Sequence, residues 1–436
     1  MPQPYVGFWQ ENAGDRPLLP AFTGQETGDV AICGAGFTGL ATAIQLKEKK
    51  PHLRVMVVEK ERVGWGASGR NAGFAMRLFG LSLETTVLLH GREKTQEADQ
   101  YMREAVNHVR NVITKYDLKC DFIERGMMTV ASTPGELRQL EKEMELAEKM
   151  NLPGFTWLEG ERARDRVDSP SYRAARFDEH AALLHPARLV RELLRTALDK
   201  GVEVYEGSPV LEVDLKRKIF HLPGGEIRAH ALLLATNAYS GFVPYLHRRQ
   251  LPIFTYIALT EPLPPSFFEE TWKAPIGIED ARNYLHYYRP TPDGRLLFGG
   301  GDALYYYGGD LHRASHPSLY AYLQEKVRRV FPQLEKVTFT HHWGGPISAT
   351  LDLIPALGAI APDVYYSMGC VGHGVSLTQY NGLTLAELIL GEDTSRTGAS
   401  FVNRKVRRIP GEPLRTLVAG GIRRFLRYQD LRGERR

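Results

Sequence analysis

The stretch Asp-Val-Ala-Ile-Cys-Gly-Ala-Gly-Phe-Thr-Gly, residues 29–39, decides the fold of this chain. A short apolar run ends at Gly34, and Gly36 and Gly39 follow in the spacing GxGxxG. In such a turn the first glycine permits a tight bend, the second lets the backbone approach a pyrophosphate, and the third lets a helix pack closely on the strand. The helix N-terminus offers free N–H groups to phosphates. The stretch therefore predicts a dinucleotide-binding turn in an α/β fold.

A second apolar run and an acidic residue complete this fingerprint. Residues 55–58 read Val-Met-Val-Val and end in Glu59, roughly 20 residues beyond the glycines, where a carboxylate can bind ribose hydroxyls. No second nucleotide site is expected, because residues 299–302 lack the third glycine and the helix, and residues 344–346 end in proline. The electrons are therefore expected to come from the organic substrate rather than from NADPH.

Two further glycine-rich segments indicate a flavin. The loop 62–73, Arg-Val-Gly-Trp-Gly-Ala-Ser-Gly-Arg-Asn-Ala-Gly, supplies donors where a simple dehydrogenase would begin its next helix. Near the other end, residues 368–376 lead from a strand at 364–367 into an apolar-periodic helix that ends near Gly391. The N-terminus of that helix can face the flavin pyrimidine edge and stabilise its negative charge after reduction. We therefore expect one cofactor held by both ends of the chain.

These segments resemble the D-amino-acid oxidase superfamily of flavoproteins, and within it the branch of gamma-glutamylputrescine oxidase and glycine oxidase. The chain shares with the gamma-glutamylputrescine oxidase branch an arm around Trp9, the loop 63–71 and the sequence Gly372-His373-Gly374. The resemblance implies a Rossmann-type FAD-binding domain of the glutathione-reductase type, interleaved with a substrate domain built on a mixed β-sheet. It also places Glu59 on the adenosine ribose and backbone groups of Val210 on the adenine.

The motifs and the resemblance together predict the residues that bind non-covalent FAD. They are Gly34, Ala35, Gly36, Phe37, Thr38, Gly39, Glu59, Lys60, Gly66, Ala67, Ser68, Arg70, Asn71, Ala72, Gly73, Val210, Thr236, Asn237, Gly345, Gly372, His373, Gly374, Val375 and Ser376. The domains are expected to interleave, with the FAD-binding domain at residues 1–80, 181–246 and 338–400, the substrate domain at 81–180 and 247–337, and a basic amphipathic tail at 401–436. Such a crossing leaves a substrate cavity at the seam.

The resemblance implies oxidation of a C–N bond by hydride transfer to flavin N5, followed by hydrolysis of the imine. Relatives that oxidise amino acids carry an arginine before the proline of the segment 343–348, where this chain has Gly345. This favours an amine without an adjacent carboxylate, of the polyamine or glutamylated-amine type. Arg289 or Arg282 can still meet a distant carboxylate. The alternative is a dehydrogenase of D-amino, N-methyl-amino or 2-hydroxy acids that passes electrons to a quinone.

The electron acceptor stays open between O2 and another molecule. Sarcosine-oxidase relatives carry an oxygen-activating lysine in the strand that resembles residues 295–298, where only Leu297 stands near that position. His373 is the first candidate for a contact with flavin or substrate. Tyr284, Tyr288 and Trp343, together with His286, form either an aromatic cage for an ammonium group or ordinary core. Cys370 is interpreted as an inert buried cysteine rather than as a covalent flavin link.

Composition narrows the class of protein. The chain has 436 residues, a formal net charge of +4 and only three cysteines. This favours a two-domain enzyme, gives no indication of a nucleic-acid partner, and argues against a disulfide framework. No metal-ligand spacing appears. The first 28 residues lack the apolar core of a signal peptide, and we expect a cytoplasmic location.

The tail from Phe401 is strongly basic. Between Leu414 and Leu426 its apolar residues repeat at helical spacing, so that one face is apolar and the other basic. We expect the apolar face to dock on the protein itself, with the arginines in solvent. The alternative is peripheral contact with an anionic membrane.

Overall fold

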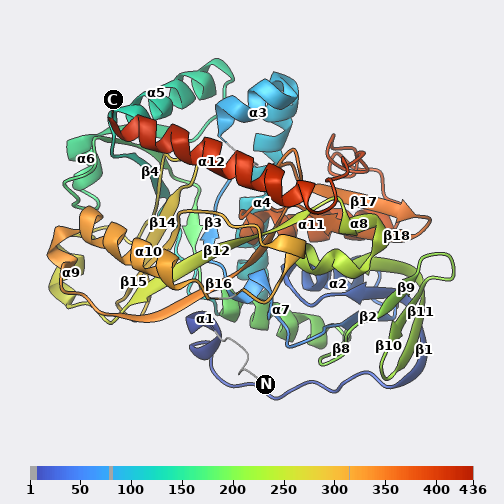
Figure 1. Ribbon diagram of the computed structural model, residues 1–436. Helices are drawn as coiled ribbons and strands as arrows, with labels where there is room; N and C mark the ends of the chain where they lie inside the picture. The colour runs from blue at the N-terminus through green and yellow to red at the C-terminus, as the bar shows by residue number, and fades with distance from the viewer. Residues whose placement is uncertain (1–6, 78–81, 314, 436) are drawn as a thin grey trace.

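Two eight-stranded sheets carry the fold in this computed structural model, which describes residues 7–77, 82–313 and 315–435 (Figure 1). Residues 1–6 and 78–81, which belong to the expected domain segments 1–80 and 81–180, lie outside the described residues. The mixed α/β architecture predicted from the sequence is confirmed. A third sheet has only two strands, β3 (Phe74–Ala75) and β7 (Ala182–Leu183), which pair antiparallel.

The first sheet contains the predicted dinucleotide-binding strand at its centre. Its strand order is β17-β18-β11-β1-β2-β8, and a β9-β10 hairpin extends β11. The strands are β1 (Gly24–Cys33), β2 (Val55–Val58), β8 (Glu203–Tyr205), β9 (Glu212–Asp214), β10 (Ile219–Leu222), β11 (Gly225–Leu234), β17 (Ala356–Ala361) and β18 (Val364–Met368). Strand β1 runs parallel to both neighbours, β2 and β11. Because parallel strands end at one edge, the loops after β1, β2 and β11 meet there.

The second sheet is mixed, as expected for the substrate domain. Its order is β16-β12-β15-β14-β13-β4-β6-β5, and within it β13 and β4 pair parallel. The strands are β4 (Met127–Ala131), β5 (Phe155–Glu159), β6 (Ala174–Asp178), β12 (Leu251–Thr260), β13 (Gly277–Asp280), β14 (His286–Pro290), β15 (Leu296–Gly300) and β16 (Phe339–Ala349). Strand β16 pairs with β12 along its length, so the second sheet extends past residue 338, where the third segment of the FAD-binding domain is expected to begin. The pairing partner lies about 90 residues away, and no local pattern reveals it.

The helices cover both sheets. They are α1 (Phe8–Glu11), α2 (Phe37–Lys49), α3 (Leu83–His90), α4 (Arg92–Tyr116), α5 (Pro134–Lys149), α6 (Gly160–Arg164), α7 (Pro186–Asp199), α8 (Pro244–His247), α9 (Pro265–Glu270), α10 (Pro317–Val330), α11 (Gly374–Ile389) and α12 (Leu414–Arg435). In the described part of the chain, no helix combines the length and apolar character needed to span a bilayer.

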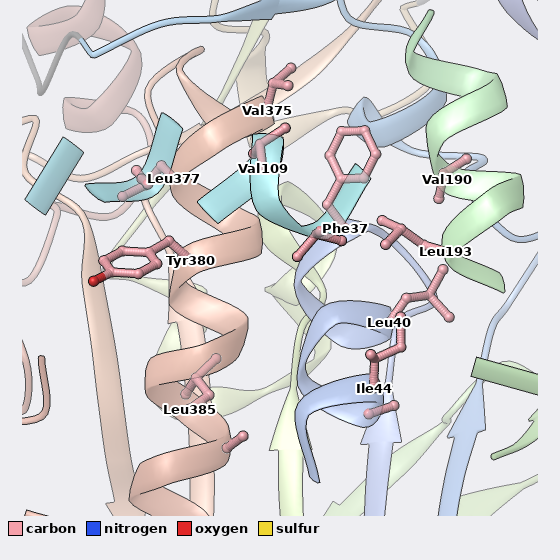
Figure 2. Close-up of a cluster of buried hydrophobic side chains, with 14 of the residues drawn as sticks. Phe37, Leu40, Ile44, Val109, Val190, Leu193, Val375, Leu377, Tyr380 and Leu385 are labelled. Atoms are coloured by element: carbon pink, nitrogen blue, oxygen red, sulfur yellow. The ribbon is translucent and has the colours of Figure 1, made fainter. Parts of the chain in front are cut away.

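Helices α2 and α11, from opposite ends of the chain, pack side by side above the first sheet. Figure 2 shows Leu40 of α2 facing Leu193 of α7, and Val375 of α11 near Val109 of α4. A Cβ atom at Gly382 would lie 2.6 Å from the Cβ of Ala41, so the two helices touch backbone to backbone. This contact fixes the loop before α11 relative to the glycine turn before α2.

Helix α12 crosses the surface of the second domain as a long diagonal bar (Figure 1). It docks through polar groups: Arg423 Nη2 lies 2.6 Å from Asp302 Oδ2, and Asp430 accepts a hydrogen bond from the backbone N–H of Asn283 at 3.0 Å. Its apolar side chains point outward instead, with Leu417 68% and Phe425 59% exposed. The expectation that the apolar face docks is therefore wrong, because ion pairs and hydrogen bonds orient this helix.

Candidate functional site

The glycine turn after β1 has the close packing that the sequence predicts. Gly34 has a φ of +107°, and a Cβ atom there would lie 2.6 Å from the carbonyl oxygen of Ala235. At Gly39 a Cβ atom would lie only 2.0 Å from the carbonyl oxygen of Gly34. The turn therefore tolerates no side chain at these two positions, and helix α2 begins directly at the end of the strand.

Glu59 at the end of β2 faces this turn. Its carboxylate accepts hydrogen bonds from the backbone N–H groups of Ala35 at 2.9 Å and Glu61 at 3.0 Å. Burial raises the pKa of Glu59 above its ordinary value, and the two N–H donors oppose that rise. The acid therefore sits beside the first helical turn, where the fingerprint requires a ribose-binding carboxylate. Lys60, which follows it, is exposed.

The loop 62–73 folds back over the start of α2. Ser68 Oγ accepts a hydrogen bond from the backbone N–H of Phe37 at 3.0 Å. Asn71 turns its side chain into the loop itself: Nδ2 donates to the carbonyl oxygen of Ser68 at 2.9 Å, and Oδ1 accepts from the N–H of Gly73 at 2.8 Å. The side chains of Ser68 and Asn71 thus fix the conformation of this loop, and Gly66, Ala67 and Ala72 belong to the same loop.

Strand β16 of the second sheet closes on this loop. Trp343 Nε1 donates to the carbonyl oxygen of Arg70 at 2.8 Å, and the indole is fully buried. A Cβ atom at Gly345 would lie 3.5 Å from Cδ of Arg70. The predicted residues Arg70, Trp343 and Gly345 are therefore neighbours. The indole of Trp343 positions the loop by its hydrogen bond to the backbone of Arg70.

The loop before α11 has an unusual backbone. Val371 has a φ of +47°, between Gly369 at +78° and Gly372 at +89°. A β-branched residue in the left-handed region is strained, and such strain concentrates at functional sites. Val371 is held there because its N–H donates to the carbonyl oxygen of Ser348 at 3.0 Å.

His373 occupies the N-cap position of α11, and burial keeps its imidazole neutral. Desolvation lowers its pKa to about 4, and Nδ1 is buried without a hydrogen-bond partner among the described residues. A buried polar atom without a partner indicates that a ligand completes its hydrogen bonding. Behind it in α11, Ser376 Oγ donates to the carbonyl oxygen of Met76 at 3.0 Å, which ties this helix to the strand after Gly73.

The remaining predicted cofactor residues lie after β11 and in the first turns of the two helices. Thr236 and Asn237 follow β11, where the Sγ of Cys370 lies 3.8 Å from Oδ1 of Asn237. Val210 precedes β9 and is half-buried. Thr38 belongs to the first turn of α2, and Gly374 and Val375 to that of α11. The cysteines Cys33, Cys120 and Cys370 are all free and buried.

The expected aromatic cage does not form. Tyr288 and Trp343 belong to different hydrophobic clusters, and Tyr288 stacks on Phe298 with ring centroids 4.9 Å apart. The hydroxyl of Tyr288 is 3.0 Å from that of Tyr172, inside the core. Tyr284 lies beneath α12, where its N–H donates to Asp430. Tyr288 therefore packs as ordinary core, the second of the two alternatives, because strand alternation turns it away from the first sheet.

Arg289, on the opposite face of the same strand, points at the loop 62–73. It is fully buried, and Nη1 donates to the carbonyl oxygens of Gly73 at 3.1 Å and Leu184 at 2.8 Å. Burial lowers its pKa to about 9. Its Nη2 has no hydrogen-bond partner in the described part of the chain. Arg289 thus braces the loop and retains one free donor.

Sequence reasoning missed a set of buried charges on this same sheet. Glu279 of β13 and Arg176 and Asp178 of β6 face a common cavity, together with Arg77. The alternation of Arg176 and Asp178 with Phe177 was the available signal, but alternation is equally typical of a solvent-exposed face.

The site residues fit a flavin dinucleotide. Two glycine positions that no Cβ can occupy, a carboxylate beside the turn, and an unpartnered imidazole nitrogen at the start of a second helix occupy one edge of the first sheet. Backbone N–H groups at the two helix N-termini would hold the pyrophosphate and the flavin. Of the predicted set, Gly34, Glu59, Arg70 and Gly345 are linked to this edge by direct contacts.

Comparison with known proteins agrees with this site. Residues 29–388 match the DAO family of FAD-dependent oxidoreductases. The chain is 31% identical to the probable oxidoreductase OrdL of Haemophilus influenzae over 383 residues, 86% of each chain. It is also 31% identical to the gamma-glutamylputrescine oxidoreductase of Escherichia coli over 373 residues, 84% of each chain.

Solved structures share the fold. Glycine oxidase from Geobacillus kaustophilus superposes with a TM-score of 0.73 at 20% identity, covering 88% of this chain and all of that one. The L-alpha-glycerophosphate oxidase of Mycoplasma pneumoniae, solved with FAD bound, gives 0.66 at 17% identity and covers 88% and 97%. Together, the matched family and the glycine turn establish FAD as the cofactor. The chain belongs to the DAO family of FAD-dependent oxidoreductases.

Proposed function

We propose that this enzyme oxidises a C–N bond of a primary or secondary amine of the polyamine or glutamylated-amine type. The observation that carries the proposal is Gly345, which stands where amino-acid-oxidising relatives have a carboxylate-binding arginine. The similarity to a gamma-glutamylputrescine oxidoreductase supports it. Its three free buried cysteines suit a reducing compartment such as the cytoplasm.

FAD, when bound, supplies a two-electron acceptor for hydrogen from the carbon next to nitrogen. The protein residues must bind the amine in its neutral form and exclude water. A desolvated site favours the neutral amine over the ammonium. His373 is neutral near pH 7, since its pKa lies at about 4, so it can hold a polar group without adding positive charge. Water then hydrolyses the resulting imine.

Anaerobic mixing of the FAD-loaded enzyme with a substrate panel tests the proposal. The panel contains diamines, N-acylated and γ-glutamylated diamines, N-methyl amino acids, D-amino acids and 2-hydroxy acids. We expect the amines to remove the yellow flavin absorbance fastest. The proposal fails if only amino acids or hydroxy acids do so. Readmission of O2, and measurement of hydrogen peroxide, then separates an oxidase from a dehydrogenase.

A second candidate is a membrane-associated dehydrogenase that passes its electrons to a quinone. The observation that favours it is α12, whose outward residues Leu417, Ile422 and Phe425 are 68%, 49% and 59% exposed. The exposed Arg424 and Arg432 lie beside them, so this face complements an anionic membrane surface. The acceptor would then be a lipid-soluble quinone.

Sedimentation with phosphatidylglycerol vesicles tests this candidate. We expect binding that weakens in salt and in the variant Phe425→Gln, and faster reduction of a vesicle-borne quinone in the presence of substrate. Phosphatidylcholine vesicles, which lack net negative charge, serve as the control. The absence of binding even at low salt would contradict membrane association. A concentration-dependent dimer that is lost in Phe425→Gln would instead assign the outward apolar residues of α12 to self-association.

A further inference from the structure

A cavity in the second domain lies next to the predicted FAD-binding loop. It is partly open to solvent, and Met76, Arg77, Met127 and Glu279 are among its lining residues. Arg77 lies four residues after Gly73, so at most about 14 Å of chain separates the two. The cavity is therefore within reach of a linear substrate whose other end reacts at the flavin.

Strand β13 turns Glu279 into this cavity. A Cβ atom at Gly277 would lie 2.3 Å from Cε1 of Phe74, so the Gly277 face of the strand looks toward β3 and the FAD-binding loop. Glu279, two residues later, shares this face. Asp280 lies on the opposite face, where its Oδ2 is 2.6 Å from Nδ1 of His286.

Glu279 has only half of its hydrogen bonds satisfied by the protein. Its Oε1 accepts from Thr129 Oγ1 at 2.9 Å, whereas Oε2 is buried and has no partner among the described residues. The side chain is 5% exposed. Burial raises the pKa of this carboxyl to about 7, although the charge of Arg176 and the hydrogen bond from Thr129 oppose the rise.

Arg77 presents the complementary free group. Its Nε lies 3.0 Å from Asp178 Oδ2, and its guanidinium lies over the ring of Phe155. The residue is 5% exposed, and its Nη2 has no hydrogen-bond partner in the described part of the chain. The cavity thus contains one free buried acceptor on Glu279 and one free buried donor on Arg77.

The other charged groups around the cavity are already paired. Arg176 lies 2.9 Å from Glu143, and Asp99 lies 2.9 Å from Arg103. Buried polar atoms in native proteins almost always have partners, and leaving one without a partner costs free energy. The two free atoms therefore point to a ligand that brings both a donor and an acceptor.

We propose that this cavity binds a dipolar head group, an ammonium beside a carboxylate as in an α-amino acid, at the far end of the substrate. The ammonium contacts Oε2 of Glu279, and the carboxylate contacts Nη2 of Arg77. This assignment rests on the proposed amine oxidation and names the part of the substrate that sets specificity. A plain ammonium would leave Nη2 of Arg77 unpaired beside a second positive charge.

Anaerobic stopped-flow with the FAD-loaded enzyme tests the assignment. The substrates are 1,4-diaminobutane, its N-acetyl derivative and its N-γ-glutamyl derivative, and the variant is the isosteric Glu279→Gln. We expect the variant to raise the apparent Kd of the glutamylated diamine by roughly ten- to a hundred-fold. The limiting rate of flavin reduction, and both constants for the acetylated diamine, stay within about twofold of wild type, because neither involves the head group.

Asp280→Asn is the matched control, since it neutralises the next residue of the strand on the opposite face. We expect it to leave the Kd of the glutamylated diamine unchanged. Arg77→Lys keeps a positive charge beside Asp178 but removes the planar guanidinium donor. We expect it to weaken the binding of the glutamylated diamine and to leave the binding of the other two substrates unchanged. Flavin absorbance and thermal unfolding establish that each variant folds.

Calorimetry with N5-methyl-L-glutamine separates failure of the subsite from failure of the proposed function. This probe has the head group but no amine at the reacting end, so we expect it to bind wild type and to bind Glu279→Gln much more weakly. If the probe shows this difference in binding although no amine reduces the flavin, the result supports the subsite and contradicts amine oxidation. If amines reduce the flavin but Glu279→Gln changes no Kd, or changes that of the plain diamine equally, the dipolar subsite is overturned.

Discussion

Gly39 shows how strictly single residues determine the cofactor site. Its missing side chain lets α2 begin against β1, because a Cβ atom would lie 2.0 Å from the carbonyl oxygen of Gly34. We expect Gly39→Ala to push the helix N-terminus away, at a cost of about 1–3 kcal/mol, and to yield protein largely without FAD. The ratio of flavin to protein absorbance after purification measures this.

A matched control for that substitution lies in α12. Gly421 is exposed and has no neighbouring atom within 4 Å of an added Cβ. Gly421→Ala should retain full FAD and can stabilise its helix by up to about 1 kcal/mol. Equal flavin content in the two variants would contradict the packing argument.

His185 predicts a pH dependence of stability. It is 2% exposed, and its Nδ1 caps α7 by accepting a hydrogen bond from the N–H of Arg188 at 3.2 Å. Burial, followed by the charge of Arg188, lowers its pKa from 6.5 to about 3. Below pH 6.5 the His185 imidazole therefore binds a proton in the unfolded chain but not in the folded chain. The stability of the fold decreases as pH falls from about 6.5 toward 3.

The expected size is at most about 1.4 kcal/mol of unfolding free energy for each pH unit in that window. Urea unfolding at a series of pH values measures it. His185→Asn keeps a capping acceptor but does not titrate, so its curve should lack this component. A wild-type curve parallel to that of the variant would show that His185 is not held neutral.

At the level of residues, the sequence was informative where the signal is local. Gly34, Gly39 and Glu59 follow from spacing alone, since the turn and the strand that position them lie within one βαβ unit. For Tyr288 the sequence left cage and core open, because a period-2 pattern does not say which face of a strand meets the first sheet. Glu279 was missed because its partner Thr129 lies 150 residues away in the chain.

At the level of elements, α12 shows the same limit. Its helical period was correctly predicted, but its orientation depends on Asp302, which lies 2.6 Å from Arg423 and 3.4 Å from Arg427. We expect Asp302→Asn to loosen α12, because both arginines then lose their common partner. Faster tryptic cleavage within residues 414–435 would measure this.

The effect on global stability should be small, within about 1 kcal/mol, since these arginines are partly exposed and screened by solvent. Cleavage should also speed up at high salt in the wild type but not in Asp302→Asn. Glu145→Gln, which removes an exposed pair with Lys149 on α5, is the control. Cleavage of α12 at the wild-type rate in Asp302→Asn would mean that other contacts hold the helix.

The whole molecule joins distant segments at one site. The turn before α2, the loop 62–73, strand β16 and the loop before α11 meet there, and α2 packs on α11 above the first sheet (Figure 2). The sequence predicted that both ends of the chain hold one cofactor, but it gave no sign that β16 pairs with β12 of the second sheet. Strand pairing over such separations is decided by tertiary packing rather than by local pattern.

This arrangement predicts that FAD stabilises the protein as a unit. A ligand that binds only the folded chain adds about 2.7 kcal/mol to the unfolding free energy when its concentration is a hundred times Kd. We expect urea unfolding of the FAD-free protein to show a lower midpoint, and added FAD to restore it.

The shift should report on both sheets together, because Trp343 of the second sheet donates a hydrogen bond to the loop of the first at 2.8 Å. Far-ultraviolet dichroism and tryptophan fluorescence should therefore move in parallel, and Gly39→Ala should show no shift with FAD. If added FAD shifts the dichroism midpoint but leaves the fluorescence midpoint unchanged, the second sheet unfolds independently of the cofactor.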